Sequence, residues 1–80
     1  MKALTTNQRS HLQVLSEILN VCREPKFKVQ ILEETGLSLR HLEFCLKYLL
    51  KQNLVKLHYR KRTYVTTEEG LRYLRLCTEI

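Results

Sequence analysis

The spacing of the apolar residues changes at Asn53, and this change is the strongest constraint on the fold. Before it, apolar residues at three-four spacing run through residues 39–52, which predicts a helix with one apolar face. After it, Val55, Leu57 and Tyr59 alternate with polar residues, which is typical of a half-buried strand. Asparagine tolerates positive φ, so Asn53 fits the stop between the two. We therefore expect a long helix followed directly by a strand.

A second strand is expected soon after the first. Residues 63–66 are rich in strand formers, and a short cationic segment, Arg60, Lys61 and Arg62, separates them from the first strand. Two short strands so close together predict a β-hairpin over about residues 54–66, with a tip made of cations.

A helix is expected near the N-terminus. Thr5 or Thr6 can begin it, with Gln8 at capping-box spacing from Thr5, so we place it over about residues 7–22. The side chains expected to face the core are His11, Leu12, Leu15, Ile18, Leu19 and Cys22.

Two more helices complete the expected fold. Pro25 precedes a helix over about 28–35, which Gly36 would close in a left-handed conformation. Ser38 is a good N-cap for the helix that follows, and Thr67 opens a last helix over about 67–79. The alternating residues before the second helix form either a short strand or the entry to that helix; these are Lys26, Phe27 and Lys28.

Length and composition set the class of protein. Eighty residues predict one domain, residues 1–80, with a thin core, and two glycines with one proline favour helix. The expected fold is mainly α with a small β-hairpin, in the order α-α-α-β-β-α. No apolar run approaches the ~18 residues of a membrane span, and the first residues lack a signal-peptide core. We therefore expect no membrane partner and a cytoplasmic location.

The positive charge is concentrated in the middle of the chain. Residues 26–62 contain nine Lys or Arg and three Glu, whereas the rest of the chain contains five basic and five acidic residues. The whole formal net charge of +6 therefore lies in this segment. A localised basic surface predicts a polyanionic partner.

Residues 28–35, Gly36 and residues 39–52 together predict a helix-turn-helix, in which the second helix enters the major groove of double-stranded DNA. Arg40 suits a bidentate contact to guanine, whereas Lys47, Lys51 and the hairpin cations suit phosphates. Phe44 on the outer face has three interpretations: contact with DNA, packing against the hairpin, or contact with a second chain. The residues expected at DNA are Ser38, Arg40, His41, Phe44, Lys47, Lys51, Lys56, His58, Arg60, Lys61 and Arg62. The alternative is an ordinary solvated amphipathic helix.

No group of residues suggests catalysis, a metal, a cofactor or a small-molecule site. The three cysteines, Cys22, Cys45 and Cys77, lack the spacing of a zinc site and are interpreted as apolar core residues or as disulfide partners. The histidines are too scattered for a metal site, and no nucleophile has an adjacent base. We expect a protein that is not an enzyme.

A homodimer is expected through the terminal helices. Each carries an apolar stripe beyond the one that a small core requires, and exposed apolar patches of that kind usually mark an interface. The residues expected there are Val14, Ile18, Val21, Tyr73, Cys77 and Ile80. The alternative is that these side chains cover one another inside a monomer.

Three segments resemble small archaeal winged-helix DNA-binding proteins over about residues 12–75. They are residues 36–42 (GLSLRHL), 46–55 (LKYLLKQNLV) and 64–70 (YVTTEEG), the last similar to the close of many wings, as the hairpin is called in this family. Such proteins include cellular and viral regulators and chromatin proteins. Asn53 departs from the glycine usually found before the first strand of the wing.

The resemblance implies a dimer that binds DNA. With the basic helix face and wing, it favours a transcription regulator that recognises specific sequences. Two alternatives stay open, an architectural DNA binder indifferent to sequence and a winged helix that binds proteins.

Overall fold

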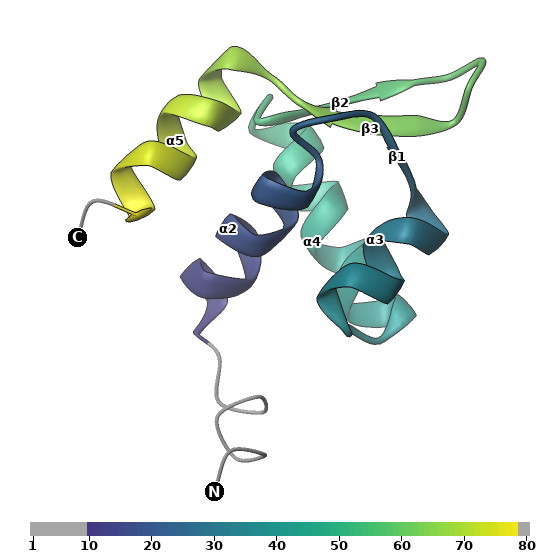
Figure 1. The fold of residues 1–80 in the computed structure, drawn as a ribbon, viewed down its shortest axis with the longest axis horizontal. Helices are drawn as coiled ribbons and strands as arrows, with labels where there is room; N and C mark the ends of the chain where they lie inside the picture. The colour runs from purple at the N-terminus through teal and green to yellow at the C-terminus, as the bar shows by residue number, and fades with distance from the viewer. Residues whose placement is uncertain (1–9, 79–80) are drawn as a thin grey trace, which may run out of the picture.

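The computed structural model describes residues 10–78 of the chain. Three of its helices, α2, α3 and α4, lie on one side of a small sheet, and α5 packs beside α2 (Figure 1). The elements in chain order are α2 (His11–Val21), β1 (Lys26–Phe27), α3 (Lys28–Thr35), α4 (Leu39–Lys51), β2 (Val55–His58), β3 (Thr63–Thr66) and α5 (Glu68–Thr78).

The first described helix begins later than expected. Ser10 is the N-cap of α2: its hydroxyl accepts from the Gln13 amide at 3.1 Å, and the Gln13 side chain accepts from the Ser10 amide at 2.8 Å. This reciprocal pair satisfies two backbone donors at a helix start, which fixes the boundary. The predicted start near residue 7 is therefore wrong, and the Thr5–Gln8 pair lies outside the described residues.

The turn between α3 and α4 follows the prediction. Gly36 has φ 73, and its amide donates to the Leu32 carbonyl at 2.9 Å, which closes α3. Ser38 caps α4, because its hydroxyl accepts from the His41 amide at 3.1 Å. Only two residues, 37 and 38, separate Gly36 from α4, so the two helices form the expected helix-turn-helix.

The sheet has three antiparallel strands in the order β1-β3-β2. Lys26 pairs with Tyr64 and Val55 with Thr66, so the segment before α3 is a strand that ends where the helix begins. Asn53 has φ 62, which confirms the predicted stop before β2. The sheet therefore ties the segment before α3 to the far strand of the hairpin.

The start of α5 is held against the end of α4. The Thr67 hydroxyl accepts from the Gly70 amide at 3.0 Å and donates to the Asn53 carbonyl at 2.8 Å. A side chain at Gly70 would overlap the Leu54 carbonyl oxygen, so the close approach requires glycine at this position. The predicted N-cap at Thr67 is confirmed.

The core fills the space between α2, α3, α4, the sheet and α5. Thr66 extends it to the sheet, because its hydroxyl donates to the Leu19 carbonyl at 2.7 Å. The buried apolar residues are Val14, Leu15, Ile18, Leu19, Cys22, Ile31, Leu42, Cys45, Leu46, Leu49, Val55 and Leu74. His11 and Leu12, predicted to face the core, are exposed.

Two of the three cysteines belong to this core. Cys22 and Cys45 are buried and Cys77 is half-buried, and all three are free thiols. Burial is the main cause that raises the pKa of Cys22 to about 12, and burial also raises the pKa of Cys45. The prediction of apolar core residues is therefore correct for Cys22 and Cys45.

None of the helices within residues 10–78 has the length and the apolar character that spanning a membrane requires.

Candidate nucleic-acid interface

The outer face of α4 is exposed along its length. Leu42, Cys45 and Leu49 are buried on the inner face, whereas Arg40, Phe44, Lys47 and Lys51 are exposed on the outer face. Phe44 is 65% exposed, which is unusual for an aromatic ring in a small protein. This division into two faces is the one that the sequence predicts.

Two neighbouring hollows lie along this face and the inner side of the hairpin. A cavity of about 430 Å³ is lined by Arg40, Glu43, Phe44, Leu46, Lys47 and Leu50, together with Lys28 and Tyr64. A second cavity of about 490 Å³ is lined by Lys28 and Tyr64 again, with Phe27, Leu57, Tyr59 and Arg62. Because the two cavities share Lys28 and Tyr64, we treat them as one surface, the α4–hairpin groove.

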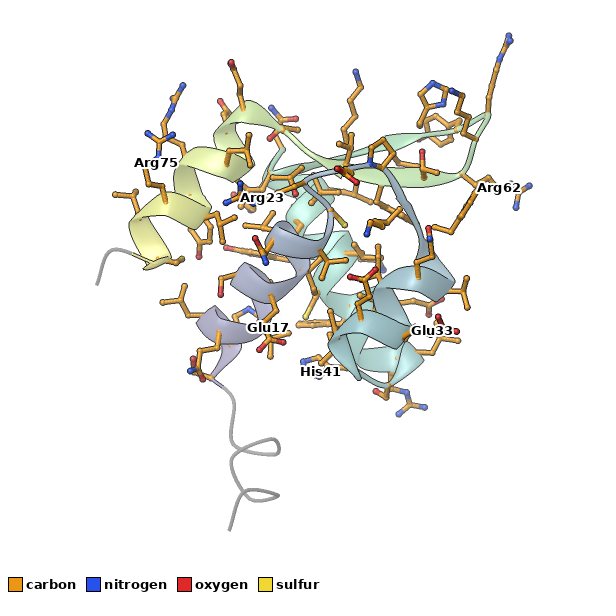
Figure 2. All side chains as sticks on the ribbon, in the orientation of Figure 1. Glu17, Arg23, Glu33, His41, Arg62 and Arg75 are labelled. Carbon is orange, nitrogen blue, oxygen red and sulfur yellow. The ribbon has the colours of Figure 1, made fainter. Side chains whose placement is uncertain are left out.

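The groove is predominantly basic. Glu43 is the one carboxylate among the described residues that line it, and its Oε2 lies 3.2 Å from the Lys28 Nζ. This pair leaves Arg40, Lys47 and Arg62 as the uncompensated charges of the groove. Arg62 lies at the far end of the hairpin, where it points away from the helices (Figure 2). The groove therefore presents positive charge at both ends.

The hairpin loop that carries these cations is closed by its own hydrogen bonds. The Arg62 amide donates to the His58 carbonyl at 2.7 Å, and Arg62 has φ 55. The Lys61 amide donates to His58 Nδ1 at 3.4 Å. Arg60, Lys61 and Arg62 are all exposed, so three cations project from one short loop.

Not all of the predicted residues face the groove. Val55 is buried and Leu57 lines the groove, so the alternation of the strand turns Lys56 and His58 to the opposite face of the sheet. Ser38 uses its hydroxyl to cap α4, and His41 lies at the start of that helix, far from the hairpin (Figure 2). Of the predicted α4 residues, Arg40, Phe44 and Lys47 line the groove, and Lys51 extends their face beyond it.

Eight residues that line the groove were not predicted from the sequence: Phe27, Lys28, Glu43, Leu46, Leu50, Leu57, Tyr59 and Tyr64. Lys28, Phe27 and Tyr64 come together because β1 pairs with β3, and Tyr59 is the first residue of the hairpin loop. The alternation through Lys26–Phe27 was the available signal for the first two. Glu43 pairs with Lys28, fifteen residues away, and no local spacing predicts this contact.

The residues predicted at a dimer interface separate into two groups. Val14 and Ile18 are 2% and 0% exposed in the single chain, so they offer no surface to a partner and this part of the prediction is wrong. Val21, Tyr73 and Cys77 are half-buried, and burial is the main cause that raises the pKa of Tyr73. Ile80 lies outside the described residues.

A model of the winged helix-turn-helix family matches residues 8–80, which is nearly the whole chain. The chain belongs to this family. The winged helix-turn-helix assignment confirms the expected fold class, with α3 and α4 as the motif and the β2–β3 hairpin as the wing. Winged helix-turn-helix domains typically bind DNA and are not enzymes. No curated protein matches the chain.

Proposed function

We propose that this winged helix-turn-helix protein binds specific sequences of double-stranded DNA as a small transcription regulator. The observation that carries the proposal is the basic lining of the α4–hairpin groove, in which Lys28 is shared between the part that contains Arg40 and Lys47 and the part that contains Arg62. A recognition helix fits the major groove of a duplex. The cations of the wing and of the surface between wing and helix fit the phosphates beside that groove.

The roles of the side chains follow from their chemistry. Arg40 lies near the N-terminus of α4, the end of a recognition helix that reaches base edges, and a guanidinium can donate two hydrogen bonds to guanine. Lys28, Lys47, Lys51 and the three wing cations act on phosphates. Because phosphate contacts carry no direct sequence information, specificity rests on Arg40 and on the contacts of Phe44.

The salt dependence of binding tests the proposal. Six cations at phosphates predict a slope of log K against log salt of about −5 per protomer. Replacing Arg60, Lys61 and Arg62 by Ala together should reduce that slope by roughly 2–3 and weaken all duplexes alike. Arg72→Ala, an exposed cation on α5, is the matched control and should leave the slope unchanged. A flat salt response of the unmodified protein contradicts the proposal.

Selection from random duplexes separates a regulator from an architectural binder. A regulator returns a consensus sequence, whereas equal recovery of all sequences favours the architectural function. Recovery of an acidic protein, with no duplex binding at low salt, favours a protein-binding winged helix instead.

A homodimer is proposed on a smaller surface than the sequence predicts. Its support is the exposure of Leu12 (43%) and Leu76 (63%), at the start of α2 and near the end of α5, two helices that pack together. Sedimentation equilibrium should give twice the 9.6 kDa mass of one chain, and Leu76→Glu should halve it. Leu39→Glu, equally apolar and 50% exposed on α4, is the control. A mass of one chain for the unmodified protein rules out the dimer.

A further inference from the structure

The hairpin end of the α4–hairpin groove has more exposed aromatic surface than phosphate binding requires. Tyr59 is 82% exposed and Phe27 is 49% exposed, and both line the cavity of about 490 Å³ together with Tyr64. Phosphate contacts need cations and hydrogen-bond donors, which the rings of Phe27 and Tyr59 do not supply along their faces. Exposed aromatic rings gathered in one concave place indicate a ligand with apolar, planar parts.

We propose that this end of the groove binds unpaired nucleotides of DNA that adjoin a duplex, such as a single-stranded tail or a locally melted segment. Bases stack on Tyr59 and Phe27, and Lys28 and Arg62 contact the phosphates where the duplex meets the unpaired nucleotides. The inference rests on the proposed function, because the duplex part of this ligand occupies the outer face of α4.

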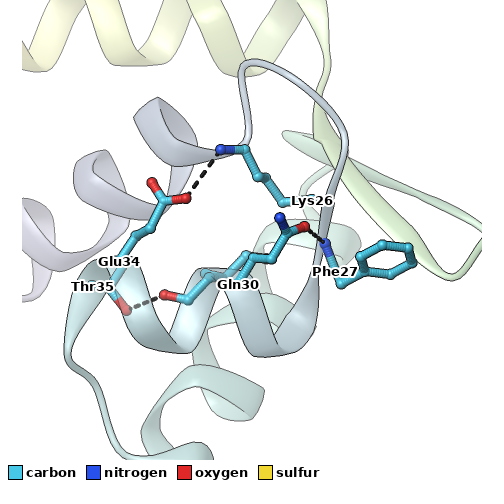
Figure 3. A network of polar contacts seen from close by, with 6 residues as sticks. Lys26, Phe27, Gln30, Glu34 and Thr35 are labelled. Carbon is cyan, nitrogen blue, oxygen red and sulfur yellow. Dashed lines mark hydrogen bonds and ion pairs between the residues drawn. The ribbon is translucent and has the colours of Figure 1, made fainter.

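The two rings are held in place by the backbone around them. Phe27 is paired in β1, and its amide donates to the Gln30 side chain at 2.8 Å (Figure 3). The ring points outward from this network, away from the Lys26–Glu34 ion pair of 3.1 Å (Figure 3). Tyr59 follows β2 directly, in the loop that the Arg62 amide closes on the His58 carbonyl. Because the backbone at both positions is already ordered, binding a base requires no ordering of the chain that carries the rings.

The charge of the site matches a nucleic-acid strand. Arg62 has no carboxylate partner among residues 10–78, and the Lys28 ammonium has only the exposed Glu43. The volume of about 490 Å³ falls within the range of sites for small ring systems. Cations beside aromatic rings are the combination that binds single strands, because every base offers a flat face and every nucleotide a phosphate.

A paired duplex cannot use these rings fully. Its base faces are covered by neighbouring base pairs, so only edges and the backbone reach a protein surface. Unpaired bases expose their faces, and each base stacked on an aromatic ring contributes enough to change affinity about fivefold or more. The surface therefore distinguishes a blunt duplex from one with unpaired nucleotides.

Fluorescence anisotropy with four DNA probes tests the inference: a blunt duplex, the same duplex with a short 5′ tail, the same duplex with a short 3′ tail, and the tail alone. We expect one tailed duplex to bind about tenfold more tightly than the blunt one, as stacking of one or two bases predicts. Tyr59→Ala and Phe27→Ala should abolish this preference, so that each variant binds the blunt and the tailed duplex with equal affinity. Tyr59→Phe, which keeps the ring, should retain the preference.

A second readout reports stacking directly. A 2-aminopurine base in the tail should lose fluorescence on binding the unmodified protein and regain most of it with Tyr59→Ala. Tyr48→Ala is the control, because this exposed ring lies outside the groove, edge-on to His11 at 6.0 Å between ring centres. The control should behave like the unmodified protein.

The outcomes separate this inference from the proposed function. Equal affinity for blunt and tailed duplexes overturns the inference and leaves duplex binding intact. Binding of the tail without binding of the blunt duplex supports the inference for single strands and contradicts the proposed function. If no probe binds at low salt, both fail, and a protein partner with an apolar, acidic surface becomes the interpretation of the groove.

Discussion

The two sides of the molecule use their apolar residues differently. On the α2–α5 side, Val14, Ile18 and Leu74 are buried, and the helices cover each other. On the side of α4 and the wing, Phe44 and Tyr59 are exposed beside cations. Apart from Leu12 and Leu76, which are proposed at the dimer contact, the apolar residues of the first side stabilise the fold, whereas those of the second are exposed to a ligand. Apolar residues beyond those that a small core is expected to need can therefore be either further core residues or an exposed binding surface, and only the packing distinguishes the two.

The largest expected difference between the two sides is in stability. Ile18→Ala should lower the free energy of unfolding by about 2–5 kcal/mol, because it leaves a cavity where the side chain is fully buried. Phe44→Ala should change it by no more than about 0.5 kcal/mol, since the ring is mostly exposed. Urea denaturation measures both. If Ile18→Ala does not fold, Ile18→Val should still cost about 0.5–1.5 kcal/mol. Equal losses for Ile18→Val and Phe44→Ala would contradict the comparison.

A smaller effect is expected in DNA recognition. Arg40→Ala should weaken binding to a selected sequence by roughly 1–3 kcal/mol and relax the choice of base at one position. Its stability should change little, because Arg40 is exposed. Competition binding with single-base variants of the selected site measures the change. A uniform loss on every duplex, like that expected of the wing cations, would show that Arg40 anchors the protein and does not recognise bases.

The smallest effect concerns the ion pair in the groove. Glu43→Gln removes the partner of Lys28, whose 3.2 Å contact is exposed, so the free energy of unfolding should fall by less than about 1 kcal/mol. Duplex affinity should rise severalfold, because the change removes a negative charge and releases a cation in the binding groove. Glu33→Gln, an exposed carboxylate on α3 outside the groove, is the control. Lower affinity with Glu43→Gln would indicate that Glu43 contacts a base.

Most of the fold could be predicted because the ends of its helices and strands are set by residues that are close together in the sequence. Gly36, Ser38 and Asn53 end or begin elements through their own φ angles and hydrogen bonds. The second apolar stripe of α2 was interpreted as a dimer contact, but most of it is core. A helix that packs against α3, β3 and α5 needs a wider apolar face than a helix with a single neighbour. Sequence periodicity reports the width of that face and not the number of its partners.

The groove was predicted only in part. The outer face of α4 is visible in the helical period, so Arg40, Phe44 and Lys47 were found. The pairing of Lys26 with Tyr64 brings Lys28 and Phe27 to the groove across almost forty residues, and no local rule predicts that pairing. Side chains alternate along β2, so Lys56 and His58 lie on the face of the sheet opposite the groove. Which set of alternate residues faces the groove depends on the face that the core covers, and the sequence alone does not show this.

The most direct test of the contrast between the two sides is a map of amide chemical shifts. The nitrogen-15-labelled protein is titrated with a selected duplex, and shifts are followed for every assigned amide. Our account predicts the largest changes at Arg40, Phe44, Lys47 and residues 60–62, with α2 and α5 nearly unchanged apart from effects of dimerisation already present without DNA. Largest changes along α2 and α5, with the wing unaffected, would contradict it.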